Sequence, residues 1–299
     1  MRKKPVVLMV FALALASMSL FAQINPTSDF YVIPVASHTV GSNGSVWMSD
    51  VAIQNIQTTP IKVQLVVIEA GEGNSDNVFP LTTDTVNGSI TVPAGGSVLL
   101  KDILNNYRGR SSTTAAILVG ADQPFAVTSR SYVTLGDGSM VGQTVTPVSG
   151  FIENTIGRTD PKSRAFLPGL VSNAAFRTNI GFVAGNSSAS GQTMAVTVTI
   201  RNSTGAVIGT RLFAIPPGNF EQLQFSVTSI TTNQFDVGSA EIAITQGNGS
   251  VVPYASVVDN KTSDASFILG QFPNSTQLLS NPFMPSLMRQ LFDRRRVLQ

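Results

Sequence analysis

The sequence WMSDVAI at residues 47–53 decides the fold class, together with FRTNIGF at residues 176–182, which it matches. Trp47, Val51 and Ile53 fall on one face of an extended strand, with Met48, Asp50 and Gln54 on the other. The second stretch repeats the alternation with phenylalanine and isoleucine. A period of two with one apolar face is typical of a half-buried antiparallel strand. The pattern predicts an all-β protein in which Trp47 is a core residue.

Further matches occur in the same order along both halves of the chain. They pair Ile33-Pro34 with Leu167-Pro168, VPAG at 92–95 with IPPG at 215–218, and TSRSY at 128–132 with YASVV at 254–258. Self-similarity in a fixed order indicates an internal repeat. Each copy contains short runs of alternating apolar residues, separated by turn residues such as Gly136-Asp137-Gly138 and Gly247-Asn248-Gly249. Runs of this kind predict β-sandwiches.

We therefore expect two tandem immunoglobulin-like β-sandwich domains, the first over residues 30–148 and the second over residues 164–272. The polar segment 149–163 is the predicted linker. The matched segments, with ASVVDNKT at 255–262, resemble a family of exported bacterial proteins with paired immunoglobulin-like repeats and no assigned activity. The resemblance covers residues 30–270 and implies the domain count. It implies no functional residues.

The N-terminus has the pattern of a secretory signal peptide at residues 1–22. Arg2, Lys3 and Lys4 precede an apolar run over residues 6–16, and cleavage is expected after Ala22. The protein is therefore expected to be secreted, periplasmic or on the cell surface, with a retained signal anchor as the open alternative. No transmembrane span is predicted after signal removal. The chain has no cysteine, which excludes disulfides, thiolate metal sites and cysteine nucleophiles.

Charge argues against nucleic-acid binding. Removal of the signal peptide leaves 16 basic residues against 17 acidic ones, and four of the basic residues lie in the tail 280–299. The rest of the chain offers no basic stripe for a nucleic-acid backbone. The basic tail has the spacing of a short amphipathic helix. It predicts either a frayed or locally docked terminus with solvated charges, or a weak membrane or partner contact.

The sequence contains few residues that could form a catalytic or metal site. His38 is the only histidine, so a serine hydrolase relay or a histidine metal site would have to use it. No serine-elbow motif accompanies it, and we interpret His38 as a loop or strand-end residue. Two acidic loops, at residues 136–139 and 259–264, have the composition of tight turns. We predict no catalytic residues, metal site or cofactor, and no binding residue is identified.

The leading hypothesis is a non-catalytic exported module for adhesion, for recognition of a protein or glycan at the cell surface, or for structural spacing. Export, duplicated sandwiches and few ionisable residues all favour it. The alternative is a carbohydrate-active hydrolase with an unrecognised carboxylate pair, which would need a cleft holding both carboxyl groups.

Overall fold

The computed structural model describes residues 27–41, 44–71, 78–80, 89–149, 156–157, 164–186 and 191–272. Within these ranges the chain is built almost wholly from antiparallel strands, which confirms the all-β prediction. The predicted signal peptide 1–22 and the predicted tail 280–299 lie outside the described residues. No helix among the described residues is long and apolar enough to cross a membrane.

The elements of the first half are β1 (Ser28–Val40), β2 (Val46–Gln54), β3 (Ile61–Glu69), β4 (Val78–Pro80), β5 (Ser89–Val92), β6 (Ser97–Leu100), α2 (Ile103–Arg108), β7 (Thr113–Thr134), β8 (Met140–Val145) and β9 (Val148–Ser149). Those of the second half are β10 (Ile156–Gly157), β11 (Arg164–Ser172), β12 (Phe176–Asn186), β13 (Met194–Asn202), β14 (Val207–Ile215), β15 (Phe220–Ser226), the 3₁₀ helix η4 (Val227–Ser229), β16 (Phe235–Gln246), β17 (Gly249–Asp259) and β18 (Ala265–Leu269). Strand β10 lies within the predicted linker and pairs with β17.

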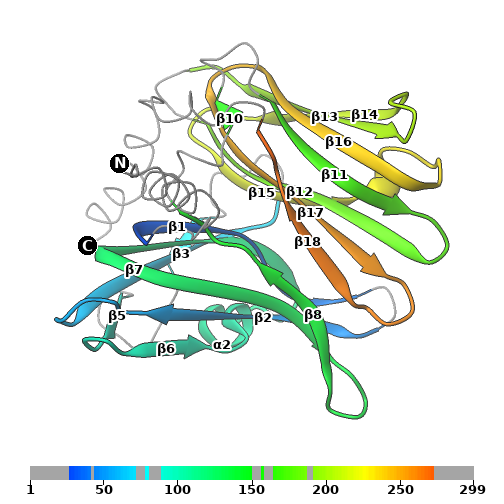
Figure 1. Ribbon diagram of the computed structural model, residues 1–299. Helices are drawn as coiled ribbons and strands as arrows, with labels where there is room; N and C mark the ends of the chain where they lie inside the picture. Colours follow the sequence, from blue (N-terminus) through cyan, green and yellow to red (C-terminus); the bar gives the residue numbers. More distant parts are fainter. Residues whose placement is uncertain are drawn as a thin grey trace, which may run out of the picture.

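The strands form four stacked layers (Figure 1). Layer 1 contains β6, β2, β8 and the second part of β7. Layer 2 contains β3, most of β1, the first part of β7 and the short strands β4, β5 and β9. Layer 3 contains β10, β17, β12, β15 and β18, and layer 4 contains β11, β16, β13 and β14. The alternating apolar runs at residues 115–119 and 125–133 predict two separate strands in the region of β7. The structure instead shows one strand of 22 residues that passes from layer 2 into layer 1.

The strand pairing of the first half recurs in the second, in agreement with the predicted internal repeat. The pair β2–β6 corresponds to β12–β15, the pair β3–β5 to β13–β14, and the pair β7–β8 to β17–β18. In the second half the path of β7 is divided between β16 and β17. Both halves are antiparallel sandwiches by this pairing. Their immunoglobulin-like classification and their independence as domains stay predictions.

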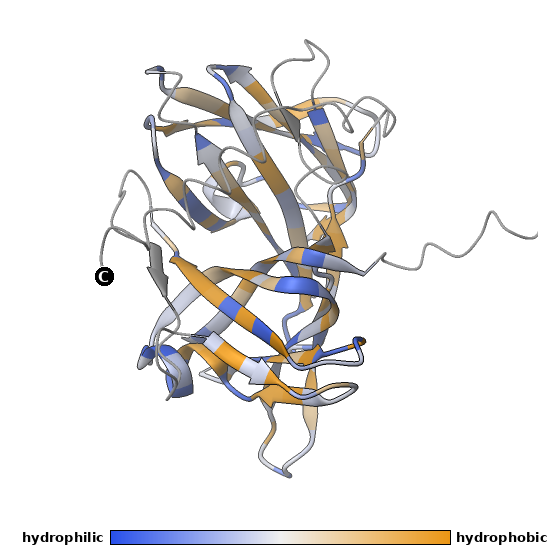
Figure 2. Ribbon diagram, turned by 90° about the vertical axis from the view of Figure 1, so that its left-hand side faces the viewer, coloured by the Kyte–Doolittle hydropathy of each residue, from blue (hydrophilic) through white to orange (hydrophobic). Residues whose placement is uncertain are grey.

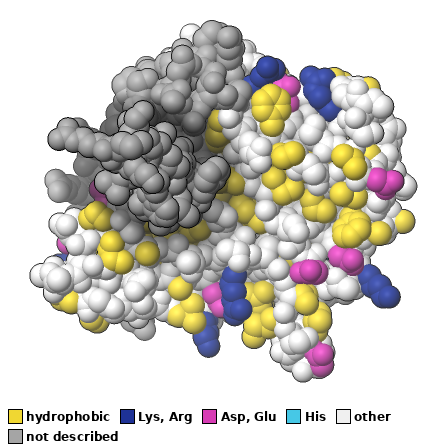
Figure 3. Space-filling view, in the orientation of Figure 1, with side chains coloured by type: hydrophobic (Ala, Val, Ile, Leu, Met, Phe, Trp, Pro, Cys, Tyr) yellow, Lys and Arg dark blue, Asp and Glu magenta, His cyan; other side chains and the backbone are white. Residues whose placement is uncertain are grey.

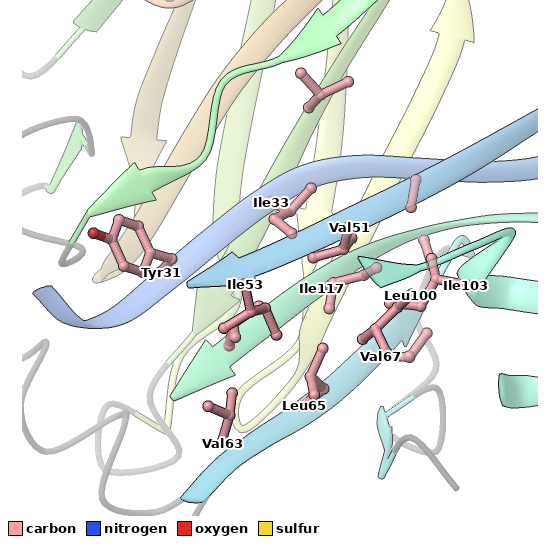
Figure 4. Close-up of a cluster of buried hydrophobic side chains, with 14 of the residues drawn as sticks. Tyr31, Ile33, Val51, Ile53, Val63, Leu65, Val67, Leu100, Ile103 and Ile117 are labelled. Atoms are coloured by element: carbon pink, nitrogen blue, oxygen red, sulfur yellow. The ribbon is translucent and has the colours of Figure 1, made fainter. Parts of the chain in front are cut away.

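Three apolar cores hold the layers together. Alternate residues of each strand point to opposite faces, so the hydropathy of the ribbons is banded (Figure 2). The first core lies between layers 1 and 2 and includes Val51, Ile53 and Ile117 (Figure 4). The second fills the space between layers 3 and 4. The third joins layer 2 to layer 3, so the two halves share a buried interface.

Trp47 is not the core residue that the sequence predicts. It shares a strand face with Val51 and Ile53, and these two are fully buried. Trp47 is only half-buried and lies outside the first core, against Gly41. The alternation was predicted correctly, but the tryptophan lies toward the end of the sandwich. Truncation of Trp47 is therefore expected to cost less stability than truncation of a fully buried aromatic residue.

A buried asparagine anchors the same turn in each half. Asn55 donates through Nδ2 to the carbonyls of Val92 (3.1 Å) and Pro93 (2.9 Å), and Asn186 donates to the carbonyl of Ile215 (2.8 Å). Each asparagine thus reaches the strand end that carries the Pro-x-Gly turn matched between the halves. The turn glycines have positive φ, at 64° and 80°. The same asparagine side-chain contact therefore holds the strand end before this turn in both halves.

We expect Asn55→Ala and Asn186→Ala each to lower the free energy of unfolding by about 1–3 kcal/mol, because each leaves buried carbonyls without a donor. Urea unfolding would measure both variants, with Asn233→Ala, at an exposed position, as the control. A cost at only one of the two asparagines would show that the two contacts are not equivalent.

Candidate functional site

His38 has a carboxylate partner that the sequence did not reveal. It lies near the end of β1, as predicted, and its Nδ1 is 2.7 Å from Oδ1 of Asp102. Both side chains are largely buried. Asp102 is 64 residues away and belongs to the connection between β6 and α2. The acidic partner of His38 therefore comes from a segment that sequence proximity does not indicate.

The pair is part of a larger ionic network. Asp102 has a left-handed backbone (φ 43°, ψ 60°), and its N–H donates to Oδ1 of Asp50 at 2.9 Å. The buried Asp50 carboxylate also accepts from Arg130 (3.1 and 3.3 Å) and from the Tyr132 hydroxyl (3.1 Å). Burial, together with the nearby Asp50 carboxylate, raises the pKa of Tyr132. The network joins β1, β2, α2 and β7.

The internal repeat helps to interpret this network. Asp50 lies opposite Arg130 across the strand pair, and at the matching place in the second half Asn179 lies opposite Ser256. The equivalent strand pair in the second half has uncharged residues at this position. The sandwich topology therefore does not require the charged side chains of Asp50 and Arg130. Asp50 already has four hydrogen bonds and is buried, so it is poorly placed to contact a substrate. The contacts of the network stabilise the packing of neighbouring elements against one another.

We expect His38→Ala to lower the free energy of unfolding by about 1–2 kcal/mol and to leave ligand binding unchanged. The change removes one bond to Asp102, whose carboxylate water can still reach. Thermal unfolding and the binding assay described below should be measured on the same sample. Loss of activity at wild-type stability would overturn the non-catalytic interpretation, whereas loss with unfolding would indicate a packing role alone.

The two acidic loops are turns, as predicted. Asp137 accepts hydrogen bonds from the backbone and hydroxyl of Ser139, and these bonds lower the pKa of Asp137. Asp259 accepts from the backbone N–H groups of Thr262 and Lys261, which lower its pKa. The loops connect β7 to β8 and β17 to β18. In the described part of the chain, no group of three or more acidic or histidine side chains is placed to hold a metal ion.

The outer face of layer 4 presents a different kind of surface. Its inward residues belong to the second core, so the alternate residues point outward. Nine of them form a three-by-three array that we call the layer-4 grid. The grid contains Arg164, Phe166 and Pro168 on β11, Ser239, Glu241 and Ala243 on β16, and Thr197, Thr199 and Arg201 on β13.

Glu241 is the centre of the grid. It lies opposite Phe166 on one side and Thr199 on the other. Its carboxylate is 3.2 Å from Nη1 of Arg164 and 3.5 Å from Nη2 of Arg201. The Arg164 guanidinium also lies over the Phe166 ring, 5.3 Å from its centroid. Two cations from different strands are thus held around one carboxylate beside an aromatic ring.

The grid is partly exposed to solvent. Arg164 and Arg201 are 50% and 38% exposed, whereas Glu241 is 18% exposed. In Figure 3, charged and apolar side chains lie close together over the upper part of the molecule, where layer 4 lies. Arg201 is also anchored by a bond from its Nη1 to the Gly205 carbonyl (3.2 Å). The polar groups are therefore positioned before any ligand arrives.

Comparison with the first half shows how unusual this face is. Layer 2 is the counterpart of layer 4, and there Val32 lies opposite Leu118, which lies opposite Val66. This apolar row is buried against layer 3. In layer 4 the equivalent row is Phe166, Glu241 and Thr199. One copy of the repeat buries this row against the other half, and the second copy leaves an aromatic, acidic and hydroxyl row partly exposed.

Sequence reasoning missed the grid. Its members lie on three strands, and six of the nine are the polar residues that any strand with one solvent-facing side would show. The threonines in MAVTVTIRN (β13) are the one local sign of a continuous polar face. The convergence of two arginines on Glu241 depends on strand order, which the sequence did not predict.

No family model matches the chain, and no curated protein matches it. Solved structures that it resembles include Thermotoga maritima 1070, with 13% identity, a TM-score of 0.30, and coverage of 41% of this chain and 95% of that one. Another is the CBM22-1-CBM22-2 tandem domain of Paenibacillus barcinonensis Xyn10C, with 12% identity, a TM-score of 0.22, and coverage of 75% and 78%. A third is a lectin from Pleurotus ostreatus in complex with GalNAc, with 8% identity, a TM-score of 0.19, and coverage of 81% of each chain. Likenesses this distant give no basis for transferring a function.

Proposed function

We propose that this protein is a non-catalytic, exported recognition module that binds a glycan on the outer face of layer 4. The observation that carries the proposal is the partly exposed row of Phe166, Glu241 and Thr199, flanked by Arg164 and Arg201. The predicted signal peptide supports a place outside the cytoplasm.

The chemistry of the row complements a sugar. A sugar ring has apolar C–H faces that pack on an aromatic ring such as Phe166, and hydroxyl groups around its rim. A carboxylate accepts hydrogen bonds from hydroxyls, guanidinium groups donate to them, and threonine hydroxyls do both. Glu241, the two arginines and Thr199 supply these three kinds of group within one grid.

The scaffold also favours binding. The grid residues are on paired strands rather than loops, which holds their side chains in place. The ion pairs position both guanidinium groups before binding, so less side-chain entropy is lost when a ligand is bound. The sheet face can contact several successive sugar units of a chain.

The test is to measure binding of the chain from residue 23 onward to an array of oligosaccharides, followed by titration calorimetry on those that bind. We expect Phe166→Ala to weaken binding at least about tenfold, because it removes the stacking surface. Phe176→Ala is the matched control, since Phe176 is a 36% exposed phenylalanine on β12 in layer 3. Both variants should unfold close to the wild-type temperature.

Equal binding by wild type and Phe166→Ala, or loss of binding in Phe176→Ala alone, would contradict the proposed surface. The hydrolase alternative is tested on the same ligands. Release of new reducing ends from a bound oligosaccharide, absent in a denatured sample, would show that the protein is an enzyme.

A further inference from the structure

We propose that the layer-4 grid selects acidic glycans, whose sugars carry carboxylate or sulfate groups. This inference rests on the proposed function and adds the ligand class. The starting point is the charge of the grid, which contains two arginines and one glutamate among its nine residues.

The accessibility of the charges decides what a ligand meets first. Glu241 is recessed, at 18% exposure, with a guanidinium on each side, and both guanidinium groups are more exposed than the carboxylate. The outermost ionised groups of the grid are therefore cationic. An approaching carboxylate or sulfate is attracted, and the repulsion from Glu241 is reduced by the two intervening cations.

The number of guanidinium N–H donors on the grid also favours an acidic glycan as the ligand. A guanidinium has five N–H donors. Arg164 makes one hydrogen bond, to Glu241, and Arg201 makes one to Gly205 and an ion pair with Glu241. Within the described part of the chain most donors of both groups have no partner. Planar guanidinium groups bind carboxylates and similar oxyanions through two parallel hydrogen bonds, which a single neutral hydroxyl cannot form.

Glu241 contributes by positioning the arginines. Its two oxygens contact guanidinium groups from strands on opposite sides of β16. The Phe166 ring under Arg164 restricts that side chain further. The result is a pair of cations beside an aromatic ring, which fits an acidic sugar that stacks through its ring and binds through its charged substituent.

The experiment compares three oligosaccharides of equal length: one of uronic acids, one sulfated, and one neutral. We expect the wild-type chain to bind at least one of the acidic probes about tenfold more tightly than the neutral one, with the difference shrinking as salt rises. Arg164→Ala and Arg201→Ala should each reduce that preference at least about threefold. Glu241→Gln, which removes the negative charge, should keep or increase it.

Arg110→Ala is the matched control, because Arg110 forms a similar exposed ion pair with Glu69 in the first half (2.9 Å, 46% exposed). It should bind all probes as the wild type does. Equal binding of the neutral and acidic probes would overturn this inference and leave the proposed function standing. Failure of all three probes and of the wider array would overturn both. The uronate and sulfate arms show which anionic group is preferred.

Discussion

Gly181→Ala is expected to destabilise the protein by about 3 kcal/mol, the upper end of the usual cost of an added methyl group in a packed core. A Cβ at this position would lie 2.3 Å from the Cζ and hydroxyl oxygen of Tyr254 and 2.7 Å from the carbonyl oxygen of Leu223. Real Cβ atoms do not approach other atoms so closely. The variant therefore requires either the ring or the strand backbone to move.

Neither neighbour can move easily. Gly181 and Tyr254 are directly opposite each other on β12 and β17, and the Tyr254 ring stacks on Phe267 at 5.8 Å. The Tyr254 hydroxyl is bonded to the side chains of Gln222 and Gln224. Only glycine at position 181 leaves enough space for the Tyr254 ring.

Urea unfolding would measure the effect, with Gly136→Ala as the control. An added Cβ at Gly136 would meet no atom within 4 Å in the described part of the chain. The control should stay within about 0.5 kcal/mol of wild type. Similar stability of the two variants would mean that Tyr254 does not lie over Gly181.

Tyr254→Ala is expected to cost about 3–5 kcal/mol and to separate the unfolding of the two halves. Tyr254 belongs to β17 of the second half, but its side chain is buried with the first core. It therefore contributes apolar surface to the contact between the two halves. Removing the ring leaves a cavity that the surrounding strands can fill only in part.

Calorimetry would show whether the wild type unfolds in one transition and Tyr254→Ala in two. Tyr254→Phe is the matched control, because it keeps the ring and loses only the hydroxyl bonds. It should cost about 1–2 kcal/mol and keep a single transition. Two transitions in the wild type would show that the shared interface does not couple the halves.

The same burial predicts sensitivity to alkali. Burial raises the pKa of Tyr254, while its hydrogen bond to Gln222 lowers it by less. In the unfolded chain the pKa of a tyrosine is about 10. The folded state therefore holds this proton more tightly, so its contribution to stability is present below about pH 10 and is lost as pH rises further. Burial also raises the pKa of Tyr31 and Tyr132, which add to the effect.

The sequence alone determined the class of fold, because the signals for it are local. Alternation with a period of two places Val51 and Ile53 on one face of β2 whatever surrounds the strand. Turn residues such as those of the β7–β8 connection act through the backbone conformations that they allow. The repeat was visible because both halves need the same turn at the end of β5 and β14.

The tertiary structure decided which faces are buried between the halves and which face solvent. Val32 and Phe166 occupy equivalent positions of the repeat, yet Val32 is covered by layer 3 and Phe166 lies on the partly exposed layer-4 grid. The exposure of Trp47 likewise depends on where the sandwich ends. The partnership of His38 with Asp102 and the convergence of Arg164 and Arg201 on Glu241 join distant segments. Side chains separated in sequence meet only once strand order and layer stacking are set, and alternation within a strand carries no information about either.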